Sequence, residues 1–230
     1  MNISPSNFQF LKTLSENNNR DWFAAHKSDY VQAHENAISV ADSLLKKLSE
    51  LDHISTVSGK KSLMRIYRDV RFSKDKSPYN PRWAGGFSRS KPALRGGYYF
   101  HMQPGGKTVV GGGFYQPNSE DIKLIRAHIA ADDEPLRQVI SSAPFIDTFG
   151  ELQGDQLKTA PKGYEKDHPS IDLLRYKSMY VFKSLSDKEV TSADFLESAL
   201  SAFLALRPFF DVMTEFLTTD LNGISLLKKA

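Results

Sequence analysis

The sequence predicts an α+β fold, in which an antiparallel sheet of about four to five strands is flanked by N-terminal and C-terminal helices. Three observations lead to this prediction. Apolar residues recur at helical spacing towards both ends of the chain. The middle of the chain, residues 62–116, is instead rich in Gly, Tyr, Phe and Arg. Within it, residues 98–103 follow the period of two that is typical of a strand.

The N-terminal quarter should be helical. An apolar pattern over residues 8–14 predicts a first helix, which the Asn run at 17–19 should interrupt, because Asn side chains favour turns and caps. The apolar stripe that follows predicts one long amphipathic helix over residues 20–49. Trp22 and Phe23 open this stripe, so we expect both rings to anchor the helix in the core.

The strands should lie in the middle of the chain. Residues 98–103 and 107–115 should pair as a β-hairpin, because the Pro-Gly-Gly sequence at 104–106 is a strong turn former. Residues 84–89 predict a further strand. A fourth is expected over residues 63–67.

The C-terminal half returns to helical patterns. Ser119 is expected to cap a helix, since Ser is a favoured N-cap residue. Residues 179–185 predict one more strand. Residues 191–194 resemble a capping box in front of another helix. Pro208 should end or kink that helix, and a final helix should run through Phe216.

Composition limits the class of protein. The chain has 230 residues, 40% of them hydrophobic, which predicts a single globular domain over residues 1–230. The net charge of +3 is too small to identify a nucleic-acid-binding protein by itself. The absence of cysteine excludes disulfides, thiolate metal ligands and a Cys nucleophile. We find no apolar run long enough for a signal peptide or a membrane span, so we expect a cytoplasmic location and no membrane partner.

Several segments resemble one known family. The most specific is RIYRDVRFSKDKSPY at residues 65–79. The others are NNNRDWF at 17–23, GGYYFH at 96–101, GGGFY at 111–115, PKGY at 161–164, LLRYK at 173–177 and LRPF at 206–209. In this order they resemble an uncharacterised family catalogued as a domain of unknown function, DUF2461. The resemblance covers nearly the whole chain and implies a single domain with an ordered loop at 154–168. It implies no activity, cofactor or site residue.

The segment 65–79 is also the richest in groups that could bind a ligand. It holds five cations, Arg65, Arg68, Arg71, Lys74 and Lys76, against two anions, Asp69 and Asp75. Guanidinium groups match the oxygens of phosphates and carboxylates. The segment therefore predicts a binding site for a small anionic ligand, such as a phosphorylated one. An equally strong expectation is that these residues form ion pairs that join a helix to the sheet.

Three functions follow from this segment. The first is a binder of, or an enzyme acting on, a small anionic ligand. The second is a nucleic-acid-binding protein, in which the same cations contact phosphates while Tyr and Trp rings stack on bases. The third is a non-catalytic interaction module. The sequence identifies no cofactor and no oligomeric state.

Arg68 has a distinct expected role. If the chain is a strand here, Arg68 shares the core-facing side with Met64 and Ile66. An unpaired guanidinium is very costly in apolar surroundings, so Arg68 should meet a carboxylate or line a cleft. Arg71, Lys74 and Lys76 should stay in water as an outer rim.

Other candidates are weaker. His101 has a suitable pKa range for acid–base chemistry, but nothing in the sequence places a carboxylate beside it. Asp69 is the other weak catalytic candidate. Arg175 adds a cation to the predicted ligand-binding set. Asp167 and His168 are neighbours in an extended stretch, so their side chains should point apart.

Three motifs are assigned structural roles or rejected. The Gly-Gly-Lys-Thr sequence at 105–108 imitates the end of a P-loop, but a strand pattern follows it and His101 occupies the position of the first Gly, so we predict a hairpin turn. The Gly run at 111–113 predicts close backbone approach to a neighbouring element or to a ligand, and we favour the neighbouring element. The six histidines lack the spacing of metal ligands, so no metal site is predicted.

Overall fold

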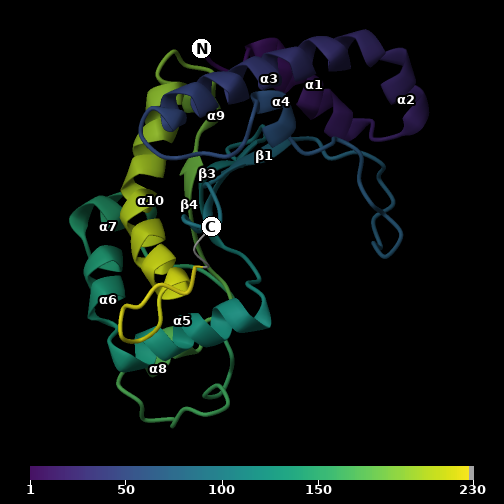
Figure 1. Cartoon of the computed structure of the whole chain (residues 1–230). Coiled ribbons are helices and arrows are strands. Elements are labelled where there is room, and N and C mark those ends of the chain that lie inside the picture. Colours follow the sequence, from purple (N-terminus) through teal and green to yellow (C-terminus); the bar gives the residue numbers. More distant parts are fainter. Residues whose placement is uncertain (228–230) are drawn as a thin grey trace. The chain divides into compact units, whose positions relative to one another are not determined.

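The computed structural model describes residues 1–227 of the chain (Figure 1). Four strands form an antiparallel sheet in the order β1-β2-β3-β4, with helices before and after it in the sequence. The strands are β1 (Trp83–Ser88), β2 (Gly97–Met102), β3 (Thr108–Phe114) and β4 (Met179–Leu185). The helices are α1 (Pro5–Glu16), α2 (Arg20–Ala25), α3 (Lys27–Ser49), α4 (Gly59–Ser62), α5 (Ser119–Ala131), α6 (Glu134–Ile140), α7 (Ala143–Phe149), α8 (Ile171–Leu174), α9 (Asp187–Val190) and α10 (Phe195–Thr218). The predicted α+β class is confirmed.

The described chain divides into two compact units. Unit 1 comprises Met1–Phe87, Tyr99–Val110 and Ser184–Ser201. Unit 2 comprises Ser88–Tyr98, Gly111–Lys183 and the described residues from Ala202 onwards. The boundary falls within all four strands and within α10, so neither unit is one continuous stretch of sequence.

The helices of unit 1 begin at side-chain caps. Ser4 caps α1 by accepting a hydrogen bond from the backbone N–H of Asn7 at 3.2 Å. Asn19 caps α2 in the same way, with the N–H of Trp22 at 2.9 Å. The Asn run at 17–19 therefore separates two helices, as its chemistry predicts.

The predicted single helix over residues 20–49 is wrong in one respect. It divides at His26, which has φ −108° and ψ 29° and belongs to neither α2 nor α3. The His26 backbone N–H and the Nδ1 atom of its ring both bond to the Trp22 carbonyl oxygen, at 3.0 and 2.8 Å. A side chain that competes for a helix carbonyl loosens the helix at that point.

The predicted strand over residues 63–67 is also wrong. The segment forms isolated antiparallel bridges to residues 79–85 at its first and last positions, with no continuous ladder. Pro81 lies in the partner segment and has no N–H to donate, so the pairing cannot continue through it. Met64, expected to face the core with Ile66, is 58% exposed, whereas Ile66 is buried.

The strands predicted over 84–89, 98–103, 107–115 and 179–185 correspond to β1, β2, β3 and β4. The predicted hairpin turn between β2 and β3 is present. Gly105 and Gly106 both have positive φ there, 83° and 69°, which Gly adopts readily. Their N–H groups each donate to the carboxylate of Asp187 at 2.9 Å.

The Gly run at 111–113 brings β3 against β4 within unit 2, as predicted. A Cβ atom on Gly111 would lie 2.0 Å from the carbonyl oxygen of Val181. No side chain fits at that distance, so Gly is required here.

Two predictions about helix N-termini need correction. The N-cap of α5 is Asn118 rather than Ser119, because the Asn118 side chain accepts from the N–H groups of Glu120 and Asp121. The capping box lies at Ser186 and Glu189, in front of α9, and not at residues 191–194. Thr191 instead donates its hydroxyl back to the Asp187 carbonyl and so completes α9.

Pro208 does not end its helix. It lies inside α10, which continues from Phe195 to Thr218. Pro208 is exposed, while Phe209, Phe210 and Met213 are fully buried in unit 2. Burial of this apolar face outweighs the loss of one backbone hydrogen bond.

No helix within residues 1–227 combines the length and the apolar character needed to cross a membrane.

Candidate functional site

The predicted ligand-binding segment is an irregular loop over residues 65–78, between α4 and β1 in unit 1 (Figure 1). We call it the cationic loop. Its base is held by Asn18, whose amide donates to the Tyr79 carbonyl at 2.9 Å and accepts from the Tyr79 N–H at 3.1 Å. The Tyr79 ring stacks on Phe23, with centroids 4.0 Å apart. Asn18, the second residue of the Asn run, thus fixes the C-terminal end of the loop.

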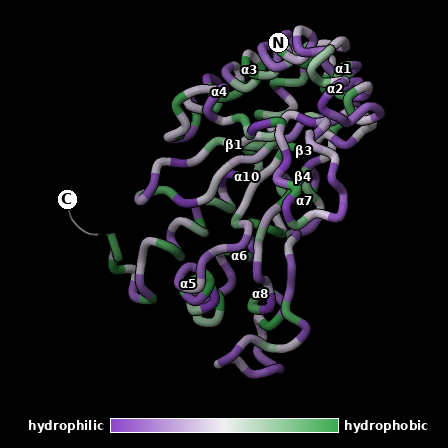
Figure 2. Tube along the Cα trace, turned by 90° about the vertical axis from the view of Figure 1, so that its right-hand side faces the viewer, coloured by the Kyte–Doolittle hydropathy of each residue, from purple (hydrophilic) through white to green (hydrophobic). Residues whose placement is uncertain are grey.

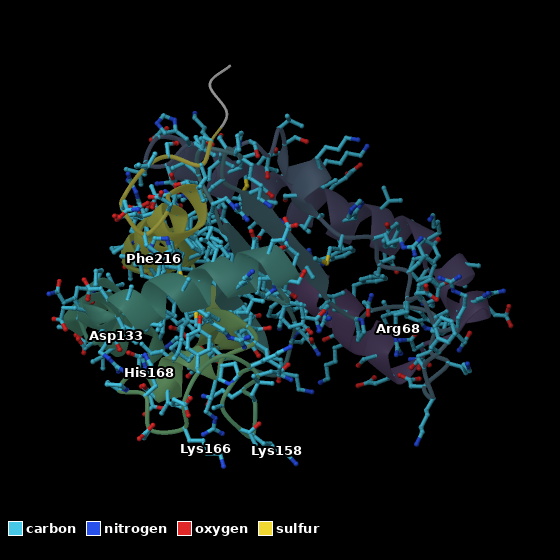
Figure 3. All side chains as sticks on the ribbon, turned by 60° about the horizontal axis from the view of Figure 1, so that its bottom comes forward. Arg68, Asp133, Lys158, Lys166, His168 and Phe216 are labelled. Carbon is cyan, nitrogen blue, oxygen red and sulfur yellow. The ribbon has the colours of Figure 1, made fainter. Side chains whose placement is uncertain are left out.

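Arg68 is the ordered cation of this loop. Its side chain, labelled in Figure 3, is 23% exposed. It forms an ion pair with Asp75. The second terminal nitrogen, Nη2, lies 3.4 Å from the hydroxyl of Ser73. The predicted carboxylate partner of Arg68 is therefore present, although Arg68 reaches it from a loop and not from the core face of a strand.

Asp75 closes the same turn. Its carboxylate accepts hydrogen bonds from the hydroxyl and the backbone N–H of Ser77, at 2.6 and 2.9 Å. These bonds, together with Arg68, hold the pKa of Asp75 well below its usual range. Asp75 is thus a charged, hydrogen-bonded acceptor that fixes the loop.

Arg71 and Lys76 also have partners inside the loop. The guanidinium of Arg71 donates to both carboxylate oxygens of Asp69, the closest at 2.7 Å, and this bond lowers the pKa of Asp69. Nζ of Lys76 donates to the carbonyl oxygen of Val70 at 2.9 Å. Lys76 therefore holds the backbone of the loop.

The remaining groups face solvent. Arg65 and Lys74 are exposed and make no hydrogen bond or ion pair within residues 1–227. Phe72 is 96% exposed, and the Arg71 guanidinium lies 5.8 Å from the centre of its ring. Tyr67 is 49% exposed. The outer side of the loop thus combines cations with aromatic surface.

The two weak catalytic candidates have structural partners. His101 lies on β2, where its Nε2–H donates to the Lys107 carbonyl at 2.7 Å and its Nδ1 accepts from the Tyr99 hydroxyl at 3.2 Å. Burial lowers the pKa of His101. Asp69 is engaged by Arg71, as described above. The catalytic roles of His101 and Asp69 stay predictions.

Arg175 belongs to unit 2 and follows α8. Its Nε donates to the carbonyl oxygen of Leu157 at 2.7 Å, which holds the segment between α7 and α8 at an internal position. That segment is mostly hydrophilic, and Lys158 and Lys166 point outwards from it (Figures 2 and 3). His168 accepts a hydrogen bond from the Ser170 N–H at its Nδ1.

One buried charged group was not predicted from the sequence. Arg89, at the start of the segment between β1 and β2, is 1% exposed in unit 2. It pairs with Asp211 at 2.6 Å and lies near the Thr214 hydroxyl. These partners are more than a hundred positions away in the sequence, so no local pattern announces them. Loss of such a partner would strand a buried charge, which is strongly destabilising.

No cluster of three or more His, Cys, Asp or Glu side chains suited to a metal ion occurs within residues 1–227. The prediction of no metal site rests on the sequence and stays a prediction.

The fold and the cationic loop together describe an α+β protein with an exposed loop rich in Arg, Lys and aromatic residues. Residues 6–212 match the model of a family described as "Conserved hypothetical protein (DUF2461)", so the chain belongs to that family. The resemblance predicted from the sequence is confirmed. Neither the curated proteins nor the solved structures include a significant match.

Proposed function

We propose that this protein binds single-stranded nucleic acid through the outer side of the cationic loop. One observation carries the proposal: Phe72 is 96% exposed between two cations, Arg71 and Lys74. A fully exposed Phe on an ordered loop is costly to keep in water, and an aromatic face next to cations suits a base attached to a phosphate.

The charges of the loop divide into two sets that support this role. Arg68 and Lys76 are occupied by Asp75 and by the Val70 carbonyl, so they hold the loop in shape. Arg65, Lys74 and the outward part of Arg71 remain available for phosphates. Arg71 keeps a side chain that is 77% exposed even while it pairs with Asp69.

The outer cations occur at separate positions of the loop, 65, 71 and 74, and this favours a chain of phosphates over a single small anion. A small anion needs several donors that converge on one point, whereas a polyanion can use separated cations one phosphate at a time. Stacking on Phe72 and on the half-exposed ring of Tyr67 is tolerant of base identity, so little sequence preference is expected. We place this binding in the cytoplasm, where single-stranded RNA is present. Fractionation of tagged protein tests that location.

The test is fluorescence anisotropy with labelled oligo(dT) and oligo(U) at several salt concentrations. We expect saturable binding whose affinity falls as salt rises. Phe72→Ala should weaken binding about tenfold or more, because one stacked base contributes about 1–3 kcal/mol. Arg65→Ala and Lys74→Ala should each lower the slope of log K against log salt by about 0.7.

The matched control is Lys158→Ala, which removes an exposed lysine from unit 2. It should leave affinity and salt slope unchanged. Binding of phosphorylated metabolites without binding of oligonucleotides would replace this function with a small-anion site. Absence of binding to either, or equal affinity of Phe72→Ala and the wild type, would refute the proposal and leave a protein-interaction role for the loop.

A further inference from the structure

A second site lies in unit 1, and none of its lining residues belongs to the cationic loop. The helices α1, α2 and α3 enclose a groove of about 680 Å³. That volume is in the range of small-molecule sites, about 300–1,000 Å³. The groove is lined mainly by amides, hydroxyls and aromatic rings.

The floor of the groove is fixed by a buried amide network. Asn7 is 1% exposed; its side-chain oxygen accepts the indole N–H of Trp83 at 2.6 Å. Its amide nitrogen donates to the Ala33 carbonyl at 2.7 Å and to the side-chain oxygen of Asn36 at 3.0 Å. Asn36 also accepts the Ser4 N–H at 3.0 Å. Each of these bonds joins different elements, so the groove keeps its shape without a ligand.

The wall of the groove presents polar groups that have no partner in the protein. The indole N–H of Trp22, the Asp29 carboxylate and the Gln32 amide make no hydrogen bond within residues 1–227, and all three line the groove. His26 donates from Nδ1 to the Trp22 carbonyl at 2.8 Å, which leaves its Nε2 as an acceptor. One donor (the Trp22 indole), two acceptors (His26 Nε2 and the Asp29 carboxylate) and one amide that does both (Gln32) therefore follow one another about one turn apart.

Charge narrows the class of ligand. The described lining contains no Lys or Arg, and Asp29 is its one carboxylate. An anion would meet this carboxylate without a compensating cation, which is unfavourable. Amide groups and a free indole N–H instead suit hydroxyl groups, which both donate and accept.

Aromatic surface completes the site. Trp22 stacks on His26 with ring centroids 4.0 Å apart, and the ring of Phe10 lies tilted against Trp22 at 6.1 Å. This pair of contacts holds the half-buried indole in one orientation. Apolar C–H surface of a ligand can pack against these rings while its hydroxyls reach the amides.

We propose that the groove between α1, α2 and α3 binds a neutral, hydroxyl-rich small molecule of the size of a mono- or disaccharide. Trp22 and Phe10 supply the apolar contact. Asp29, Gln32 and the Nε2 atom of His26 accept or donate hydrogen bonds to the hydroxyl groups. The site is independent of the nucleic-acid role proposed for the cationic loop.

The chain offers a built-in reporter for the experiment. It has two tryptophans, and Trp83 is 1% exposed while Trp22 is half-buried at the groove. The NMR resonance of the Trp22 indole N–H is followed while D-glucose, N-acetylglucosamine, maltose and myo-inositol are added separately to the full chain. Glucose 6-phosphate and choline serve as charged probes. Trp22→Phe assigns the resonance.

We expect at least one neutral probe to shift the Trp22 resonance in a saturable way, and to bind more tightly than either charged probe. Gln32→Ala should weaken binding about three- to tenfold, the usual effect of one hydrogen bond. Gln32 is exposed on a helix, where Ala is well tolerated, so this variant should fold. The matched control, Gln138→Ala on an exposed face of α6, should bind as the wild type does.

Asp29→Asn separates the remaining classes of ligand. A neutral ligand keeps most of its affinity, since an amide also hydrogen-bonds to hydroxyls, whereas a cation loses its counter-charge. The proposal is overturned if no neutral probe gives a saturable shift, if Gln32→Ala and Gln138→Ala behave alike, or if choline or glucose 6-phosphate binds best. Phe72→Ala should leave the sugar-dependent shift unchanged, so failure of one site is distinguishable from failure of the other.

Discussion

Phe23 and Trp22 are adjacent in α2 but have different surroundings. Phe23 is 3% exposed and stacks on Tyr79, whereas Trp22 is half-buried and rests on His26. Phe23→Ala should therefore lower the free energy of unfolding by about 3–5 kcal/mol. Trp22→Ala should cost clearly less, because part of the ring is already in water. Urea denaturation of both variants measures the difference. An equal or larger loss for Trp22→Ala would show that its ring is an anchor, as the sequence alone suggested.

Asp75 gives the cationic loop a pH dependence of known sign. Its pKa is lowered first by hydrogen bonds from Ser77 and then by Arg68. A carboxyl whose pKa is lower in the folded than in the unfolded state favours the folded loop when it is ionised. This contribution is complete above the unfolded pKa of about 4 and is lost as pH falls through the folded pKa.

We expect an NMR titration of the Asp75 carboxyl carbon to give a midpoint well below that of an unfolded peptide. Ser77→Ala should raise this pKa, because the bond from the Ser77 hydroxyl is its largest single cause, and Arg68→Met should raise it as well. Lys74→Ala is the control, since it removes a neighbouring charge that has no hydrogen bond to Asp75. A titration of Asp75 at the unfolded value would mean that the turn does not form in solution.

The cationic loop shows how much of a site the chemistry of single residues predicts when the fold is not known. The cost of an unpaired arginine correctly predicted a carboxylate partner for Arg68, and the partner lies seven positions along the chain. The direction of Arg68 was not predictable, because it was derived from a strand that does not form. The groove at Trp22 and Gln32 was missed altogether, since its lining comes from three helices whose packing no local pattern encodes.

At the scale of elements, apolar periodicity correctly predicted the strands and helices that pack against other regular strands and helices. The alternation in β2 appears in the structure as buried Tyr98, Phe100 and Met102. The helical stripe of α3 was equally clear, but the break at His26 depends on one ring nitrogen reaching a carbonyl, which apolar spacing does not detect. The predictions were thus wrong where one side chain, as at His26, or a proline in the partner segment, as at Pro81, determined the backbone conformation.

Pro208 provides a test at this scale. It is exposed in the interior of α10, where it removes one backbone N–H and crowds the carbonyl of Leu204. Pro208→Ala should therefore raise the free energy of unfolding, by up to about 3 kcal/mol. The matched control is Pro135→Ala, because Pro135 lies in the first turn of α6, where the N–H has no helical partner. Chemical denaturation compares the two; a gain for Pro135→Ala as large as that for Pro208→Ala would contradict this account of α10.

At the scale of the whole molecule, the family match over residues 6–212 includes residues of both units. Every strand and the longest helix also contain residues of both units. Independent unfolding of one unit would have to interrupt every strand of the sheet. Opening a β-ladder inside a strand is costly, because the freed N–H and C=O groups must find new partners.

We therefore expect one cooperative unfolding transition, as for the single domain over residues 1–230 that the sequence predicts. In differential scanning calorimetry the calorimetric and van't Hoff enthalpies should agree. Phe23→Ala acts in unit 1 and Phe209→Ala acts in unit 2, where Phe209 is fully buried. Each should lower the same Tm, by roughly 6–12 °C for a loss of about 3 kcal/mol in a chain of this size. Two transitions, of which Phe23→Ala moves one and Phe209→Ala the other, would show that the chain is built from two independently folding domains.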